Sequence, residues 1–178
     1  MDSTTPAADL AAALADATGR HVADRPAHAV GGGSINECVQ WLASDGPLFV
    51  KLADADRLEM FEAEAEGLHE LRRAAAVRVP CVLGLGAAAG RAFLALEWID
   101  FGRSTPRTEA MLGERLAALH RVTAAQFGWH RDNTIGATPQ RNDWTAEWPD
   151  FFARHRLGCQ FDLAERHGHG ERCRWQRP

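Results

Sequence analysis

The spacing of apolar residues predicts both helices and strands in the N-terminal half of the chain. Leu10, Leu14 and Ala17 recur at helical spacing between Thr5-Pro6 and Gly19, which predicts a helix over residues 5–18. Alternating apolar positions predict strands over residues 21–30, 35–42, 48–52, 81–85 and 91–98. A second helical period, over residues 57–73, separates the third strand from the fourth. The predicted order after the first helix is therefore β-β-β-α-β-β.

Local signals predict how these elements turn, pack and begin. Asp45-Gly46 is typical of a hairpin turn and joins the second predicted strand to the third. The second strand is expected to place three apolar side chains on one face: Ile35, Val39 and Trp41. Asp56 and Glu59 are expected to cap the helix over residues 57–73.

The C-terminal half is predicted to be helical around a long loop. Apolar periods predict helices over residues 106–121 and 148–166, with a loop over 122–145. Four aromatic side chains near the later helix are expected to pack as core: Trp144, Trp148, Phe151 and Phe152. The fold class is α+β, an antiparallel sheet plus one helix followed by further helices. The expected organisation is an N-terminal helix (1–19), the sheet region (20–105), a helical region (106–168) and an irregular tail (169–178).

Composition narrows the range of partners. The chain has 20 Lys and Arg against 24 Asp and Glu, a formal net charge of −4, whereas nucleic-acid binding needs a basic surplus. No apolar run approaches the roughly 18 residues that span a bilayer. The N-terminus lacks the basic and apolar regions of a targeting signal, so a cytoplasmic location is expected. We therefore expect neither a nucleic-acid nor a membrane partner.

Three features along the predicted sheet and helix are suited to a phosphorylated ligand. Gly31, Gly32, Gly33 and Ser34 form a turn between two strands, where backbone N–H groups can approach phosphate oxygens. Lys51 adds a positive charge on the third strand, and Glu64 on the following helix can hold that ammonium. Each feature alone is also typical of a hairpin turn, a solvated edge charge or an exposed helix face. Glu62 and Glu66 are alternative partners for Lys51 on the same helix.

The strand over residues 91–98 ends in an acidic and aromatic segment. In a two-lobed kinase such a segment is the hinge, where adenine bonds to backbone groups. An edge strand that ends in a loop would fit the same residues, FLALEWID at 93–100.

Longer segments carry a resemblance to a known family. They include GGGSIN at 31–36, FVKL at 49–52, LALEWID at 94–100 and FGWHRDNTIGATPQRNDWTAEWPDFFARHRL at 127–157. The chain resembles the fructosamine kinase (ketosamine-3-kinase) family of the kinase-like superfamily, which also includes aminoglycoside phosphotransferases. The resemblance covers about residues 8–168. It implies a protein-kinase-like small lobe followed by the first helices of an incomplete α-helical large lobe.

The resemblance also implies an activity and roles for individual residues. Lys51 would bind the nucleotide phosphates with Glu64 as its partner, beneath the turn formed by Gly31 to Ser34. The backbone of Glu97, Trp98 and Ile99 would bind adenine. The family uses ATP and Mg²⁺ to phosphorylate a sugar hydroxyl of a ketosamine, either a small molecule or a glycated protein side chain.

The catalytic loop of that family is absent from these 178 residues. It would read like HGDLW.GN and be followed by a metal-binding Asp, so we assign no catalytic residue or metal ligand. We expect that the chain is truncated before this loop and gives no turnover. His130-Arg131-Asp132 spells the HRD of protein kinases, but Ala137 stands where its Asn is required. Two alternatives stay open: an inactive nucleotide-binding or interaction fragment, and a small-molecule kinase of the aminoglycoside or choline type.

Overall fold

The computed structural model describes residues 6–31 and 35–169, which fall into two compact units. The first unit lies within residues 1–122 and the second within residues 123–178. Gly32, Gly33 and Ser34, three of the predicted phosphate-turn residues, lie outside the described residues. In the described part of the chain, no helix has the length and apolar character needed to cross a membrane.

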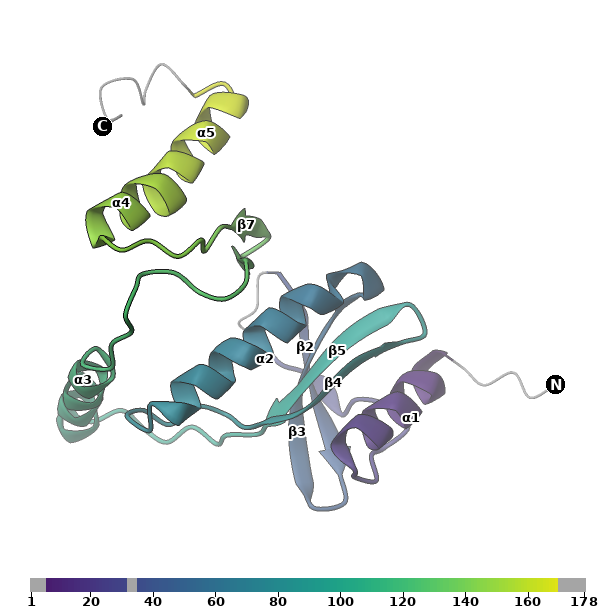
Figure 1. The fold of residues 1–178 in the computed structure, drawn as a ribbon. Helices are drawn as coiled ribbons and strands as arrows, with labels where there is room; N and C mark the ends of the chain where they lie inside the picture. The colour runs from purple at the N-terminus through teal and green to yellow at the C-terminus, as the bar shows by residue number, and fades with distance from the viewer. Residues whose placement is uncertain (1–5, 32–34, 170–178) are drawn as a thin grey trace. The chain divides into compact units, whose positions relative to one another are not determined.

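A five-stranded antiparallel sheet forms the centre of the first unit (Figure 1). Its strands are β1 (His28–Ala29), β2 (Glu37–Ala43), β3 (Gly46–Asp54), β4 (Val82–Ala88) and β5 (Arg91–Glu97), in the spatial order β1-β2-β3-β5-β4. Because β5 lies between β3 and β4 and is covered on both faces, its residues Ala92 to Leu96 are all buried. This placement explains why β5 reads as an unbroken apolar run.

Two helices cover opposite faces of this sheet (Figure 1). On one face, α1 (Pro6–Thr18) packs Leu10 and Leu14 against a group that includes Trp41, Leu48, Val50, Leu52 and Phe93. On the other face, α2 (Leu58–Arg73) packs Phe61 and Ala65 against Ala92, Leu94 and Leu96. The alternation along β3 and β5 therefore divides one sheet between two apolar cores.

The α1 helix approaches β4 so closely that only glycine fits at one position. A Cβ built on Gly84 would lie 2.8 Å from the carbonyl oxygen of Ala17, at the end of α1. Gly19 follows that helix with a φ of 67°, the left-handed conformation that glycine adopts readily at a helix C-terminus. The predicted glycine at the end of the first helix is thus confirmed.

The remaining helices bury little of their apolar surface. In the first unit, α3 (Pro106–Leu119) begins with a capping box between Thr105 and Thr108 and has no buried residue. In the second unit, a hairpin of β6 (Asn133–Ile135) and β7 (Thr138–Gln140) precedes a helical segment. That segment comprises α4 (Trp148–Phe152), a π-helical stretch (Ala153–Gly158) and α5 (Cys159–Arg166).

Three predictions about the strands and the long loop are wrong for local reasons. The first strand shrinks to β1 and an isolated bridge from Val22 to Ala43, because Pro26 lacks the N–H that a strand ladder uses. Ile35 precedes β2 and is 47% exposed, so it does not share the buried face of Val39 and Trp41. The predicted loop over 122–145 contains the β6–β7 hairpin, whose two-residue turn places Gly136 at a φ of 64°.

Two predictions about side chains are also wrong. Asp56 does not cap α2, because a 3₁₀ turn over Ala55–Arg57 leads into the helix and its N-cap residue makes no side-chain capping bond. Within the predicted aromatic core only Phe151 is buried, whereas Trp144 and Trp148 are each 49% exposed. Trp148 instead makes tilted ring contacts with Phe127 and Phe152 at the surface.

The two glycines Gly84 and Gly67 provide a matched test of the packing on this sheet. Gly84→Ala should lower the free energy of unfolding by about 1–3 kcal/mol, because its methyl group would overlap the backbone of α1. Gly67→Ala should raise it by about 0.5–1 kcal/mol, because Gly67 lies inside α2 with open space around it. Urea unfolding followed by circular dichroism measures both changes, and equal effects would contradict the described packing.

Candidate functional site

An ion pair between β3 and α2 forms the centre of the candidate site. Lys51 lies on the face of β3 that points toward α2, on the same side of the strand as Phe49 and Ala53. Its Nζ donates to Oε1 and Oε2 of Glu64 at 2.8 Å and 2.7 Å. The side chains of Lys51 and Glu64 are 21% and 32% exposed, so the pair lies at the border of the α2 core. Among the three glutamates weighed from the sequence, Glu64 is the partner of Lys51, and that predicted pairing is confirmed.

This pair fixes the position of a charge more than it stabilises the fold. A partly exposed ion pair contributes only about 0–1 kcal/mol to folding. Its two short hydrogen bonds nevertheless hold a flexible side chain in one place, where it would otherwise sample many rotamers. Lys51 is also the only lysine of the chain, since the other 19 basic side chains are arginines. Lys51 therefore carries the one side-chain ammonium of the chain, and an ammonium is a more compact point charge than a guanidinium.

Cys38 lies beside the ion pair, a position that no motif in the sequence predicts. In the β2–β3 ladder Cys38 stands directly opposite Lys51, so the two side chains share one face of the sheet. Burial raises the pKa of the Cys38 thiol above its ordinary value, and the nearby Lys51 charge only partly opposes that shift. The thiol is therefore neutral near pH 7 and does not compete with Glu64 for the ammonium.

The chain just before the predicted glycine turn pairs with β2 beside the same residues. The Val30 N–H donates to the Cys38 carbonyl at 2.8 Å, which pairs the chain with β2 just before the turn begins. Gly31 follows in an exposed bend. The turn thus connects β1 to β2, the strand that carries Cys38.

At the end of β5, the predicted adenine-binding residues differ in their hydrogen bonding. The Glu97 N–H donates to the Cys81 carbonyl at 2.9 Å, so this donor is already used. The Glu97 carboxylate accepts from Arg78 at 2.7 Å and from the Cys81 N–H at 3.1 Å, and these hydrogen bonds hold its pKa below the usual range. Trp98 and Ile99 follow, both half-buried, and the Trp98 ring lies 6.5 Å from that of Phe49.

The HRD triplet has a structural part in the second unit. The Asp132 carboxylate accepts the Asn142 N–H at 2.9 Å, and the Asn142 side chain donates to the Arg131 carbonyl and to Asn133. Asn142 itself is 3% exposed, which makes it the buried polar centre of this loop. Asp132 is therefore engaged in holding the loop.

Among the described residues, no group of three or more His, Cys, Asp or Glu side chains could hold a metal ion. The candidate site consists of a lysine–carboxylate pair, the flanking strand and helix, and the chain segments before the glycine turn and after β5.

An antiparallel sheet whose third strand carries a lysine paired to the following helix defines the class of kinase-like small lobes. Comparison with known proteins gives the family. The sequence profile of the family described as "Fructosamine kinase" matches residues 6–176, and the chain belongs to that family. This membership decides against the aminoglycoside or choline kinase alternative.

Proteins with similar sequences or structures are named as kinases of ketoamines, ribulosamines or fructosamines. A protein of Synechocystis sp. assigned as a ketoamine kinase is 42% identical over 167 residues, covering 93% of this chain and 57% of that protein. The chloroplastic protein-ribulosamine 3-kinase of Arabidopsis thaliana is 40% identical, covering 76% of this chain and 42% of that protein. A Haemophilus somnus crystal structure assigned as a fructosamine-3-kinase is 28% identical with a TM-score of 0.79, covering 90% of this chain and 55% of that one. The chain thus spans about half the length of these relatives.

The reactivity of the buried Cys38 thiol gives a test of the site. At pH 8.5, alkylation of Cys38 by iodoacetamide should be at least about tenfold slower than that of the half-buried Cys81 and Cys159, because the thiolate is the reactive form. Peptide mass spectrometry measures the three rates on the folded protein. The difference should disappear in urea, and a fast reaction of Cys38 in the folded state would place its thiol outside the site described above.

Proposed function

We propose that the first unit binds ATP and that the chain acts in the phosphorylation of ketosamines. The observation that carries this proposal is the ion pair between Lys51 and Glu64, an anchored ammonium on the sheet face that also carries Cys38. Membership of the fructosamine kinase family supports the reaction, which transfers a phosphoryl group from ATP to a sugar hydroxyl.

Phosphoryl transfer depends on positioning and charge neutralisation, and the first unit offers groups for both. Lys51 would neutralise charge on the nucleotide phosphates while Glu64 holds its ammonium in place. Backbone N–H groups of the turn from Gly31 to Ser34 would cover the phosphates. Backbone groups at Trp98 and Ile99 would receive adenine, since the Glu97 N–H is already bonded to Cys81.

Magnesium, when bound to the phosphates, would supply further charge neutralisation. The described residues bring no carboxylate cluster together for such an ion. The role proposed for this chain therefore rests on Lys51 and the backbone of the turn.

The substrate class follows from the relatives, which are named for ketoamines and for protein-bound ribulosamine. We propose a ketosamine, free or attached to a protein amine, as the phosphoryl acceptor. A cytoplasmic location stays a prediction from the sequence.

A second candidate is a nucleotide-binding module that performs no transfer. It is favoured by the use of Asp132 as a structural acceptor for Asn142, which leaves the HRD triplet without a catalytic base. Incubation with ATP, Mg²⁺ and a fructosamine separates the two candidates. Sugar phosphate formed over many turnovers supports transfer by this chain, and nucleotide binding without product supports the second candidate.

Nucleotide binding tests the proposal through Lys51. Lys51→Ala should weaken ATP binding by about 10- to 100-fold, because a charge-assisted contact to phosphate is lost. Glu64→Gln should weaken it by less, about threefold to tenfold, because the ammonium remains but is no longer held by an anion. Isothermal titration calorimetry on the full chain, with circular dichroism to check folding, measures both effects.

The matched control is Glu59→Gln, which removes the same charge from an exposed position on the same helix. It should leave the affinity for ATP unchanged. If Lys51→Ala binds ATP as well as the unaltered chain, Lys51 is outside the nucleotide site and the proposal fails.

A further inference from the structure

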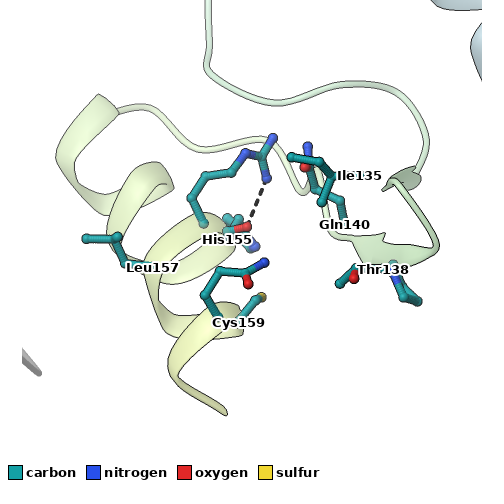
Figure 2. Close-up of a pocket in the computed structure, with 9 residues that line it drawn as sticks. Ile135, Thr138, Gln140, His155, Leu157 and Cys159 are labelled. Atoms are coloured by element: carbon teal, nitrogen blue, oxygen red, sulfur yellow. Dashed lines mark hydrogen bonds between the residues drawn. The ribbon is translucent and has the colours of Figure 1, made fainter. Parts of the chain in front are cut away.

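The second unit contains a pocket of about 410 Å³ between its hairpin and its helical segment. Figure 2 shows Ile135, Thr138 and Gln140 of the hairpin facing His155 and Cys159 of the helical segment. The volume lies in the range of about 300–1,000 Å³ that is typical of small-molecule sites. Part of the lining belongs to a π-helical stretch, a geometry that is frequent at functional sites.

Arg156 lines this pocket and is held rigidly in place. Its Nη2 donates to the Asn142 side-chain oxygen at 2.7 Å, and its Nη1 donates to the carbonyl oxygens of Arg141 and His155 at 2.8 Å and 2.9 Å. The guanidinium carbon also lies 4.5 Å from the centre of the Phe151 ring. Because Asn142 is buried, this network fixes the guanidinium between the loop and the helical segment.

The charge of Arg156 is not neutralised by the described residues. All three of its hydrogen-bond acceptors are neutral oxygens, and none of the described carboxylates forms an ion pair with it. Burial lowers the pKa of the guanidinium, yet an arginine stays protonated in proteins. The three bonds leave the Nε–H and one Nη2–H without an acceptor among the described residues, and a guanidinium can bind a carboxylate through two N–H groups.

The hairpin side of the pocket offers neutral polar groups. Gln140 and Thr138 are both half-buried, and neither side chain has a hydrogen-bond partner among the described residues. An amide and a hydroxyl at these positions can both donate to and accept from sugar hydroxyls. The pocket thus combines one fixed positive charge with groups suited to a polyol.

We propose that this pocket binds a sugar derivative that carries an anionic group, namely the ketosamine of an amino acid. Its carboxylate would bind the remaining N–H groups of Arg156, and its sugar hydroxyls would bind Gln140 and Thr138. This inference rests on the proposed function for the identity of the sugar, and it adds a binding determinant that lies wholly in the second unit.

Two matched ligands test the charge requirement on the full chain. N-(1-deoxyfructosyl)glycine carries the carboxylate, whereas N-(1-deoxyfructosyl)methylamine lacks only that group. We expect the glycine derivative to bind about tenfold more tightly than the methylamine derivative, as for a charge-assisted hydrogen bond. Titrations followed by saturation-transfer NMR measure both affinities. Equal affinities of the two derivatives would overturn the proposal. Binding of fructose 6-phosphate more tightly than the glycine derivative would also overturn it, because the anionic site would then be one for phosphate instead of carboxylate.

Three variants assign the contacts. Arg156→Gln should reduce the affinity for the glycine derivative to that of the methylamine derivative, whereas Arg154→Gln, at an exposed position outside the pocket lining, should change neither. Gln140→Leu makes no change to the Asn142 network and should weaken both ligands equally. If near-UV circular dichroism shows that Arg156→Gln is unfolded, the Gln140→Leu variant still tests the pocket. Full affinity in the Gln140 variant and in a folded Arg156 variant would contradict the proposal.

The two proposals fail separately. If ATP binding depends on Lys51 but sugar binding is unchanged in the Arg156 and Gln140 variants, only the pocket assignment is overturned. If sugar binding depends on Arg156 but ATP binding is unchanged in Lys51→Ala, only the nucleotide site is overturned.

Discussion

The candidate site of the first unit depends on a charged side chain in the middle of a strand, where the neighbouring residues on both faces are apolar. The β3 strand packs Leu48, Val50 and Leu52 against the α1 side and turns Phe49 and Ala53 toward α2. Lys51 stands between those last two residues, where an unpaired ammonium would be costly to desolvate. Glu64, which lies on α2 between the buried residues Ala63 and Ala65, compensates that charge at hydrogen-bond distance. The same contact that makes the lysine acceptable in the sheet also gives its ammonium a defined position.

The sheet was predictable from sequence because burial on two faces leaves a strong pattern. The apolar run of β5 appears where it was expected, and Glu64 is the partner of Lys51. The hairpin between β2 and β3 was also expected, but its turn residues are Ser44 and Asp45, because Gly46 already pairs with Ala43 in the ladder. Cys38 escaped prediction because its place opposite Lys51 depends on strand register, which a motif does not reveal. The β6–β7 hairpin escaped because each strand has only three residues, too few for an alternating pattern. The turn over Gly31 to Ser34 and the adenine-binding role of Glu97, Trp98 and Ile99 stay predictions.

The second unit is organised by polar contacts in place of a large apolar core. Buried Asn142 uses its backbone and its side chain to bind the loop residues Arg131, Asp132 and Asn133 and accepts a hydrogen bond from Arg156. No periodicity signals such a network, because one amide joins segments that are 14 residues apart. The aromatic residues that seemed suited to a core lie instead at the surface, apart from Phe151 beneath the Arg156 guanidinium. The long string shared with the family therefore encodes a rigid loop and the wall of a pocket.

Because Lys51 is the only lysine, its side chain can be observed without interference from any other. Labelling the protein with lysine that carries ¹³C at Cε gives one side-chain NMR signal, which reports directly on the Lys51 ammonium. Addition of ADP should move this signal in a saturable manner, and Glu64→Gln should shift its starting position and weaken the response. A signal that stays in place while the protein binds ADP would contradict the assignment of the Lys51–Glu64 pair as the phosphate anchor.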